Sequence, residues 1–237
     1  MAKKSANNRS IDDGVGGRQA VAAANKLLHL GVAGVGPLPS AQETAARALE
    51  KAGGDKDAAT KAIIATHRKL AAAEGFATGV GGFFTLAAAV PANIAGFYLV
   101  AAHMSASIAA LNGYDNQREE VQTAVLLTLV GVDADDVLAK AGVRRTPLSS
   151  VATERLPGPA VMVINKAIGF RLLGRLGGQA FSMLGRAVPL AGGAFGGAMD
   201  VYLLNQIAKN ATSGFPSQDR AALEAAPKRK LLGWRRS

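Results

Sequence analysis

The stretch that decides the fold runs from Gly75 to Tyr114: GFATGVGGFFTLAAAVPANIAGFYLVAAHMSASIAALNGY. It contains no Asp, Glu, Lys or Arg, and its titratable side chains are Tyr98, His103 and Tyr114. The parts before and after Pro91 are both compatible with helix, and Pro91 suits a first turn or a kink. The second part is about as long as a membrane span needs, but it carries several polar side chains. We therefore predict a helical hairpin divided at Pro91 and buried in protein rather than in lipid.

Glycines recur along this hairpin and again in a second segment, PLAGGAFGGAMD, at Pro189–Asp200. Small residues at helical spacing let another backbone approach closely. We expect the two segments to pack on each other. The glycines assigned to helix packing are Gly75, Gly79, Gly82, Gly192, Gly193, Gly196 and Gly197.

Composition indicates closely packed helices. Of the 237 residues, 49% are hydrophobic but only 5% are aromatic, so Ala, Leu, Val and Gly make up the apolar part. The mean hydropathy of +0.17 suits a protein with one very apolar layer, or a peripheral membrane protein. There is no Cys, which excludes disulfides and thiolate metal sites.

Capping signals outside the hairpin predict a single all-α domain, a multi-helix bundle of about seven to nine helices around the hairpin. Ser40 to Glu43 forms a capping box, Asp55 or Asp57 caps the next helix, and Asn116 with Glu119 suggests a second capping box. We expect residues 1–17 to form a disordered arm, 18–212 the domain, 143–160 a polar linker within it, and 213–237 a flexible basic tail.

The net charge of +10 is uneven along the chain. Residues 161–237 contain 11 Lys and Arg against 3 Asp and Glu, so this third attracts phosphate groups. Basic residues beside Trp and Leu suit an anionic bilayer interface, although a disordered soluble tail has the same composition. The candidate membrane- or anion-binding residues are Arg171, Arg175, Arg186, Lys228, Arg229, Lys230, Trp234, Arg235 and Arg236.

Catalytic motifs are absent from the sequence: it has no G-x-x-x-x-G-K-[ST], no H-E-x-x-H and no G-x-S-x-G. Asp200 is the sole carboxylate between Glu154 and Asp219, and it would meet His103 and Ser105 if the two Gly-rich segments packed together. Asp200 and His103 are therefore the catalytic candidates. We predict no metal, no cofactor and no specific nucleic-acid partner, because no ligand spacing or binding module is present.

Four segments resemble the EcsC family of bacteria: GFATGVGGFF at Gly75–Phe84, IAALNGYD at Ile108–Asp115, TAVLLTLVG at Thr123–Gly131 and the segment from Pro189 to Asp200. The resemblance spans about residues 58–211. The family is named for its link with a bacterial ABC-transporter operon, so the resemblance implies an all-helical fold and a membrane-proximal setting. It carries over no catalytic residue.

These observations together favour a non-catalytic, membrane-associated accessory or lipid-interacting protein that binds an anionic membrane surface through its basic C-terminal third. The start of the chain lacks the apolar core of a signal peptide, so we expect a cytoplasmic protein at the inner face of the membrane. A membrane protein such as a transporter is a second possible partner. The alternatives are a hydrolase-like enzyme with a cleft near Asp200 for an apolar or phosphorylated substrate, and a soluble scaffold or interaction protein.

Overall fold

The described part of the chain is all helix, without a strand. It comprises residues 15–36, 38–80, 86–131, 134–143, 147–183 and 189–219 of a computed structural model. The predicted all-α class is confirmed. The helices are α1 (Val15–Ala33), α2 (Ala41–Lys51), α3 (Lys56–Val80), α4 (Leu86–Leu111), α5 (Glu119–Val130), α6 (Ala134–Lys140), α7 (Leu148–Thr153), α8 (Gly158–Met183) and α9 (Pro189–Gly214).

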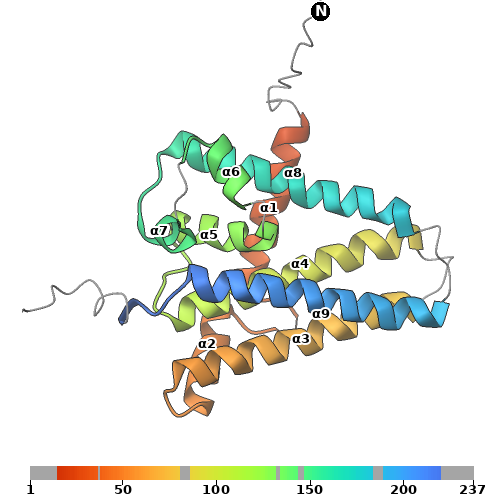
Figure 1. The fold of residues 1–237 in the computed structure, drawn as a ribbon, viewed down its shortest axis with the longest axis horizontal. Helices are drawn as coiled ribbons and strands as arrows, with labels where there is room; N and C mark the ends of the chain where they lie inside the picture. Colours follow the sequence, from red (N-terminus) through yellow and green to blue (C-terminus); the bar gives the residue numbers. More distant parts are fainter. Residues whose placement is uncertain are drawn as a thin grey trace, which may run out of the picture.

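Helix α4 is the centre of the bundle (Figure 1). It packs against α3 and α9 on one side, against α1 and α8 on another, and also against α2 and α5. Every residue from Val100 to Ala109 is buried. A helix that is apolar on all sides belongs in the interior of a protein or a membrane, and here the surrounding helices cover it. None of the helices, as far as they are described, is both long and apolar enough to cross a membrane.

The hairpin divides before Pro91, not at it. Helix α3 continues to Val80, and α4 begins at Leu86 and runs through Pro91. Pro91 lies in the second turn of α4 and has no N–H, so the helix loses one backbone hydrogen bond close to its start. The alanines on both sides have high helix propensity and favour continuation. The connection between the two helices, residues 81–85, lies outside the described residues.

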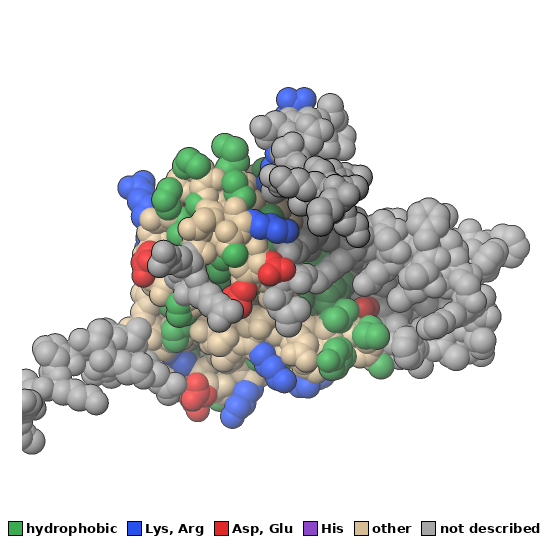
Figure 2. All heavy atoms as spheres, turned by 45° about the horizontal axis from the view of Figure 1, so that its top comes forward, with side chains coloured by type: hydrophobic (Ala, Val, Ile, Leu, Met, Phe, Trp, Pro, Cys, Tyr) green, Lys and Arg blue, Asp and Glu red, His purple; other side chains and the backbone are tan. Residues whose placement is uncertain are grey.

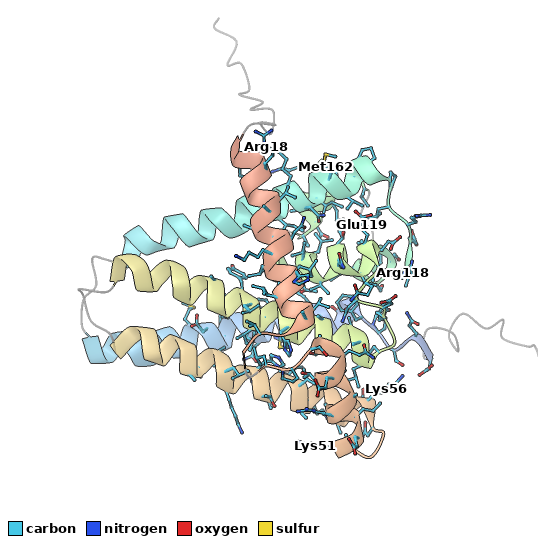
Figure 3. All side chains as sticks on the ribbon, turned by 180° about the vertical axis from the view of Figure 1, so that it is seen from behind. Arg18, Lys51, Lys56, Arg118, Glu119 and Met162 are labelled. Atoms are coloured by element: carbon cyan, nitrogen blue, oxygen red, sulfur yellow. The ribbon has the colours of Figure 1, made fainter. Side chains whose placement is uncertain are left out.

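Helices α1 and α4 approach each other at Gly31. A Cβ atom on Gly31 would lie 2.9 Å from the Cβ of Ala102 and 3.2 Å from the backbone nitrogen of His103. Gly31 lies inside α1, which continues to Ala33, so it does not end the helix. Gly31 is instead the contact that lets α1 cross over α4 (Figure 3).

Two of the three predicted N-caps are present. The Ser40 hydroxyl accepts a hydrogen bond from the Glu43 amide, and the Asp55 carboxylate accepts bonds from the amides of Asp57 and Ala58. These side chains occupy backbone donors that the first turn of a helix cannot pair internally. Both caps lie at exposed positions, where local sequence decides the structure.

The predicted capping box at Asn116 is wrong. Helix α5 begins at Glu119 with Arg118 as its N-cap residue, and no side chain caps it. Asn116 is only 7% exposed, and its Nδ2 donates a 3.0 Å hydrogen bond to the carbonyl of Ala106 in α4. The connection between α4 and α5 folds back over α4, so the buried amide bonds there instead.

The predicted linker 143–160 contains helix α7, and α8 begins within it at Gly158. Val151 and Ala152 of α7 are buried where α7 packs against α5 and α9. The predicted domain boundary at residue 212 likewise falls inside α9. Just beyond α9, Phe215 is fully buried.

Candidate functional site

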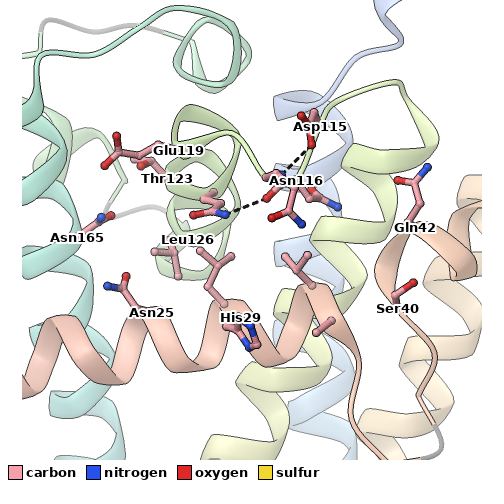
Figure 4. A pocket seen from close by; sticks show the side chains of 15 residues that line it. Asn25, His29, Ser40, Gln42, Asp115, Asn116, Glu119, Thr123, Leu126 and Asn165 are labelled. Atoms are coloured by element: carbon pink, nitrogen blue, oxygen red, sulfur yellow. Dashed lines mark hydrogen bonds between the residues drawn. The ribbon is translucent and has the colours of Figure 1, made fainter.

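A cleft of about 800 Å³ opens between α1, α5 and α8 (Figure 4). The short loop before α5 and the start of α2 complete its wall. This volume is within the range of small-molecule sites. The residues that line it are Asn25, Leu28, His29, Val32, Ala33, Ser40, Gln42, Asp115, Asn116, Gln117, Glu119, Gln122, Thr123, Leu126 and Asn165.

The wall of the cleft is polar and carries negative charge. Six of its side chains are amides of Asn or Gln, and two are the carboxylates of Asp115 and Glu119. Neither Lys nor Arg occurs among the described residues that line it. In Figure 4, Glu119, Thr123, Asn165 and Asn25 group at one end of the cleft, although they come from three different helices.

Three oxygens on this wall are buried and have no hydrogen-bond partner among the described residues: Asn116 Oδ1, Thr123 Oγ1 and Asn165 Oδ1. Thr123 is 1% exposed. The bond from Asn116 Nδ2 to Ala106 identifies the free atom of that amide as its oxygen. A buried polar atom without a partner costs about 1–3 kcal/mol, so three at one cleft require an explanation.

His103, one of the two catalytic candidates, belongs to a buried histidine pair. Its Nδ1 lies 2.7 Å from His67 Nε2, and the outer ring nitrogens contact the carbonyls of Pro39 and Ile63 at 2.8 and 2.7 Å. Both rings are 1% exposed. Burial lowers the pKa of His67 to about 4, and it lowers the pKa of His103 as well. The pair joins α3 and α4 to the loop before α2. Neither the two histidines nor the residues whose carbonyls they contact, Ile63 and Pro39, line the cleft.

The other proposed partners do not gather around His103. Ser105 accepts a 2.9 Å hydrogen bond from the Thr128 hydroxyl of α5, away from the histidine pair. Asp200 lies one turn before the buried Leu204, on the inward side of α9; it is half-buried, with Oδ2 enclosed. Asp200 does not line the cleft.

A second surface feature is the outer side of two neighbouring helices, α3 and α9, which we call the basic–apolar face. The α3 part contributes three exposed cations, and no carboxylate occurs in the sequence between Asp57 and Ala73. On α9, Met199, Tyr202 and Leu203 are 40%, 58% and 39% exposed. The face consists of Lys61, Arg68 and Lys69 of α3 and Met199, Tyr202, Leu203 and Lys209 of α9.

Hydrophobic and basic side chains lie together along the lower edge of the molecule in Figure 2, the side on which Figure 1 places α3 and α9. The two helices pack against each other along their length. Their outer sides therefore adjoin, with the exposed apolar side chains on α9 and three of the four cations on α3. Sequence reasoning missed this face because neither helix alone has an unusual composition.

Most residues predicted to bind membrane lie outside the described part of the structure. Arg171 and Arg175 belong to α8, but their side chains are not described, and Arg186 falls between α8 and α9. The tail residues Lys228, Arg229, Lys230, Trp234, Arg235 and Arg236 also lie beyond the last described residue.

The predicted packing glycines are placed only as backbone. Gly75 and Gly79 lie in α3, and Gly192, Gly193, Gly196 and Gly197 in α9, whereas Gly82 lies outside the described residues. The surroundings of these glycines are not described. At the level of elements, α3 and α9 pack extensively against each other. The closer pairing of their Gly-rich segments stays a prediction.

Comparison with known protein families gives one match: residues 38–216 match the EcsC protein family. The matched span covers most of the chain, from just before α2 to just past α9. No match was found among curated proteins or among solved structures. Helix α1, which forms one wall of the cleft, precedes the matched span.

Proposed function

The chain belongs to the EcsC protein family, and we propose that it is a peripheral membrane protein that binds anionic lipid at the cytoplasmic face of a membrane. The observation that carries this proposal is the basic–apolar face on α3 and α9. It combines four cations with three exposed apolar side chains on adjacent helices. The basic C-terminal third, with Arg171, Arg175, Arg186 and the tail cations, would add to the same attraction.

This face is chemically complementary to an anionic membrane surface. Lysine and arginine near an anionic bilayer each contribute about 1 kcal/mol of attraction. Exposed Met, Tyr and Leu side chains can enter the interface between headgroups and acyl chains, and Tyr suits that level because its ring is amphipathic.

Vesicle flotation of the full-length protein tests the proposal. We expect the protein to float with phosphatidylglycerol-containing vesicles at low salt and not with vesicles of phosphatidylcholine alone. The variant Arg68→Gln/Lys69→Gln/Lys209→Gln should bind about a hundredfold more weakly, because it removes three cations worth about 1 kcal/mol each. High salt should weaken binding of the unmodified protein in the same direction.

A matched control removes three exposed cations elsewhere: Lys51→Gln/Lys140→Gln/Arg155→Gln. The control should retain nearly all binding. If both triple variants lose binding equally, the net charge and not this face is responsible. A third variant, Lys228→Gln/Arg229→Gln/Lys230→Gln, measures the contribution of the tail. Absence of flotation by the unmodified protein at low salt would refute membrane binding and leave the enzyme and scaffold alternatives.

A further inference from the structure

The cleft between α1, α5 and α8 lies outside the basic–apolar face, since no residue of α3 or α9 lines it. Its function is therefore a separate question from membrane binding. We infer that this cleft is a binding site for a small organic polyamine. The inference rests on the convergence of unpartnered oxygens and carboxylates in a cavity of ligand size.

The wall of the cleft carries hydrogen-bond acceptors that lack donors. The three buried oxygens of Asn116, Thr123 and Asn165 lack donors among the described residues. They come from the loop before α5, from α5 and from α8, so no single local motif explains them. A ligand that brings N–H groups into the cleft would satisfy them, and polar sites select strongly for a ligand that pairs with such groups.

The wall of the cleft is also acidic. Asp115 and Glu119 are the carboxylates of the wall, and no cationic side chain is among its described residues. A positively charged ligand gains from both carboxylates, whereas an anion such as phosphate would be repelled. This polarity contrasts with the chain as a whole, whose net charge is +10. An isolated acidic cleft on a basic protein selects for cations locally, and the overall charge disfavours their nonspecific binding elsewhere.

The cleft has the size of a small organic ligand. A volume of about 800 Å³ is far larger than a single metal ion requires but suits a chain of several carbons and nitrogens. No group of three or more His, Cys, Asp or Glu side chains suited to a metal occurs among the described residues. Leu28, Val32 and Leu126 supply an apolar strip along the cleft. Methylene groups of a polyamine would lie against this strip while its nitrogens meet the oxygens.

Titration calorimetry of the full-length protein with spermidine tests the inference. Triethylene glycol, a neutral molecule with the same chain length and oxygens in place of nitrogens, is the matched ligand control. We expect heat of binding with spermidine and none with triethylene glycol at the same concentration. Equal binding of the two would overturn the assignment to a cation, and no binding of spermidine at millimolar concentration would overturn the site.

Two variants locate the binding. Glu119→Gln removes one charge and should weaken spermidine binding at least about tenfold, because hydrogen bonds to charged groups are the stronger ones. Thr123→Val keeps the shape of the side chain and removes the unpartnered hydroxyl, so it should weaken binding several-fold without lowering the melting temperature. A purely structural role of Thr123 would instead show as lost stability with unchanged affinity.

Glu50→Gln is the control for charge, because Glu50 is exposed on α2 and does not line the cleft. It should bind spermidine as the unmodified protein does. Equal weakening by Glu119→Gln and Glu50→Gln would show diffuse electrostatic binding and overturn the inference. A tighter response to Ca²⁺ than to spermidine, lost in Glu119→Gln, would overturn it in favour of a metal site. Vesicle binding should be unchanged in all three variants, which separates this result from the proposed function.

Discussion

At the scale of single residues, the histidine pair presents a problem of proton number. Its two outer nitrogens contact carbonyl oxygens, which accept but cannot donate, and its two inner nitrogens lie 2.7 Å apart. Three protons would satisfy all three contacts, whereas two neutral rings carry only two. Burial favours the neutral rings, since it lowers both pKa values. One contact therefore lacks its proton at neutral pH.

The contact between His67 and Ile63 is the one that can do without a proton at least cost. The Ile63 carbonyl lies within α3, where the backbone ladder already supplies a donor. Pro39 lies in a loop, and its carbonyl depends more on the His103 ring. We expect His67 Nε2 to donate to His103 Nδ1, and His103 Nε2 to donate to Pro39. The ring ¹⁵N chemical shifts at pH 7 would report these tautomers.

Stability should depend on pH through His67. Unfolded, its pKa is about 6.5, and burial lowers the folded value to about 4. Between these values the unfolded chain binds more protons than the folded one, so the free energy of unfolding rises with pH. The contribution of His67 to stability is therefore complete above pH 6.5 and is lost as pH falls towards 4. The full difference is about 3 kcal/mol. Urea unfolding across this range should show this slope in the unmodified protein.

Comparison of His67→Gln with His29→Gln isolates that slope from the titration of carboxylates. His67→Gln removes one of the two buried titratable rings and should reduce the pH dependence. His29 is exposed and lies outside the pair, so His29→Gln is the matched control. An unchanged slope in His67→Gln, or an imidazolium signal from the pair at pH 7, would mean that the pair keeps its third proton and that proximity outweighs burial.

At the scale of helices, the crossing of α1 over α4 depends on Gly31. A methyl group there meets Ala102 at 2.9 Å, and because the nearest atoms include backbone, little can move aside. We predict that Gly31→Ala destabilises the fold by about 1–3 kcal/mol, despite the higher helix propensity of alanine. Denaturant unfolding measures the change.

Gly158, the first residue of α8, is the matched control, because a Cβ atom there meets nothing within 4 Å. Gly158→Ala should be neutral or slightly stabilising, since it reduces the conformational freedom of the unfolded chain. If Gly31→Ala were also neutral, α1 would be able to shift on α4 without loss, and the close approach would not limit stability.

The sequence predicted the helices that are marked by N-cap residues or by an uncharged run of their own. Ser40 and Asp55 cap exposed helix starts, and the uncharged run around α4 indicated a buried helix. Asn116 does not cap α5 because its side chain is buried against α4. That burial depends on tertiary packing, which the local sequence does not show. Helix α7 was missed because it is short, and its buried face depends on α5 and α9.

The cleft was missed for a similar reason. Asn25, the stretch from Asn116 to Thr123, and Asn165 are far apart in the sequence, and each of these polar residues alone is ordinary for a helix or loop. The packing of α8 against α5, and of α1 against both, brings them to one wall. A usable signal was present: Thr123 and Asn165 are polar residues within strongly apolar helices. Polar side chains in such positions need partners, and the sequence could not say where those partners lie.

At the scale of the whole molecule, the end of α9 closes the bundle onto two distant segments. The Asn112 side chain donates to the Phe215 carbonyl at 2.8 Å, and the rings of Tyr114 and Phe215 meet edge to face with centroids 5.2 Å apart. Lys56 at the start of α3 donates to Ser217 at 3.2 Å. The start of α3 and the ends of α4 and α9 are thus joined at one side of the bundle, around Phe215.

This arrangement predicts that the bundle unfolds as one unit and that Phe215 contributes strongly to its stability. Phe215 is fully buried, so Phe215→Ala should cost about 3–5 kcal/mol through lost burial and a cavity. Because α9 packs along α3 and α4, the loss should lower the denaturant midpoint of a single transition without changing its slope. Met162→Ala, at a 66% exposed position, should change stability by less than about 0.5 kcal/mol. A separate early transition in Phe215→Ala, detected by hydrogen exchange confined to α9, would show that α9 can leave the core. Helix α3 would then lose the neighbour with which it forms the basic–apolar face. Membrane binding would in that case have to be assigned to α3 or to the C-terminal tail alone.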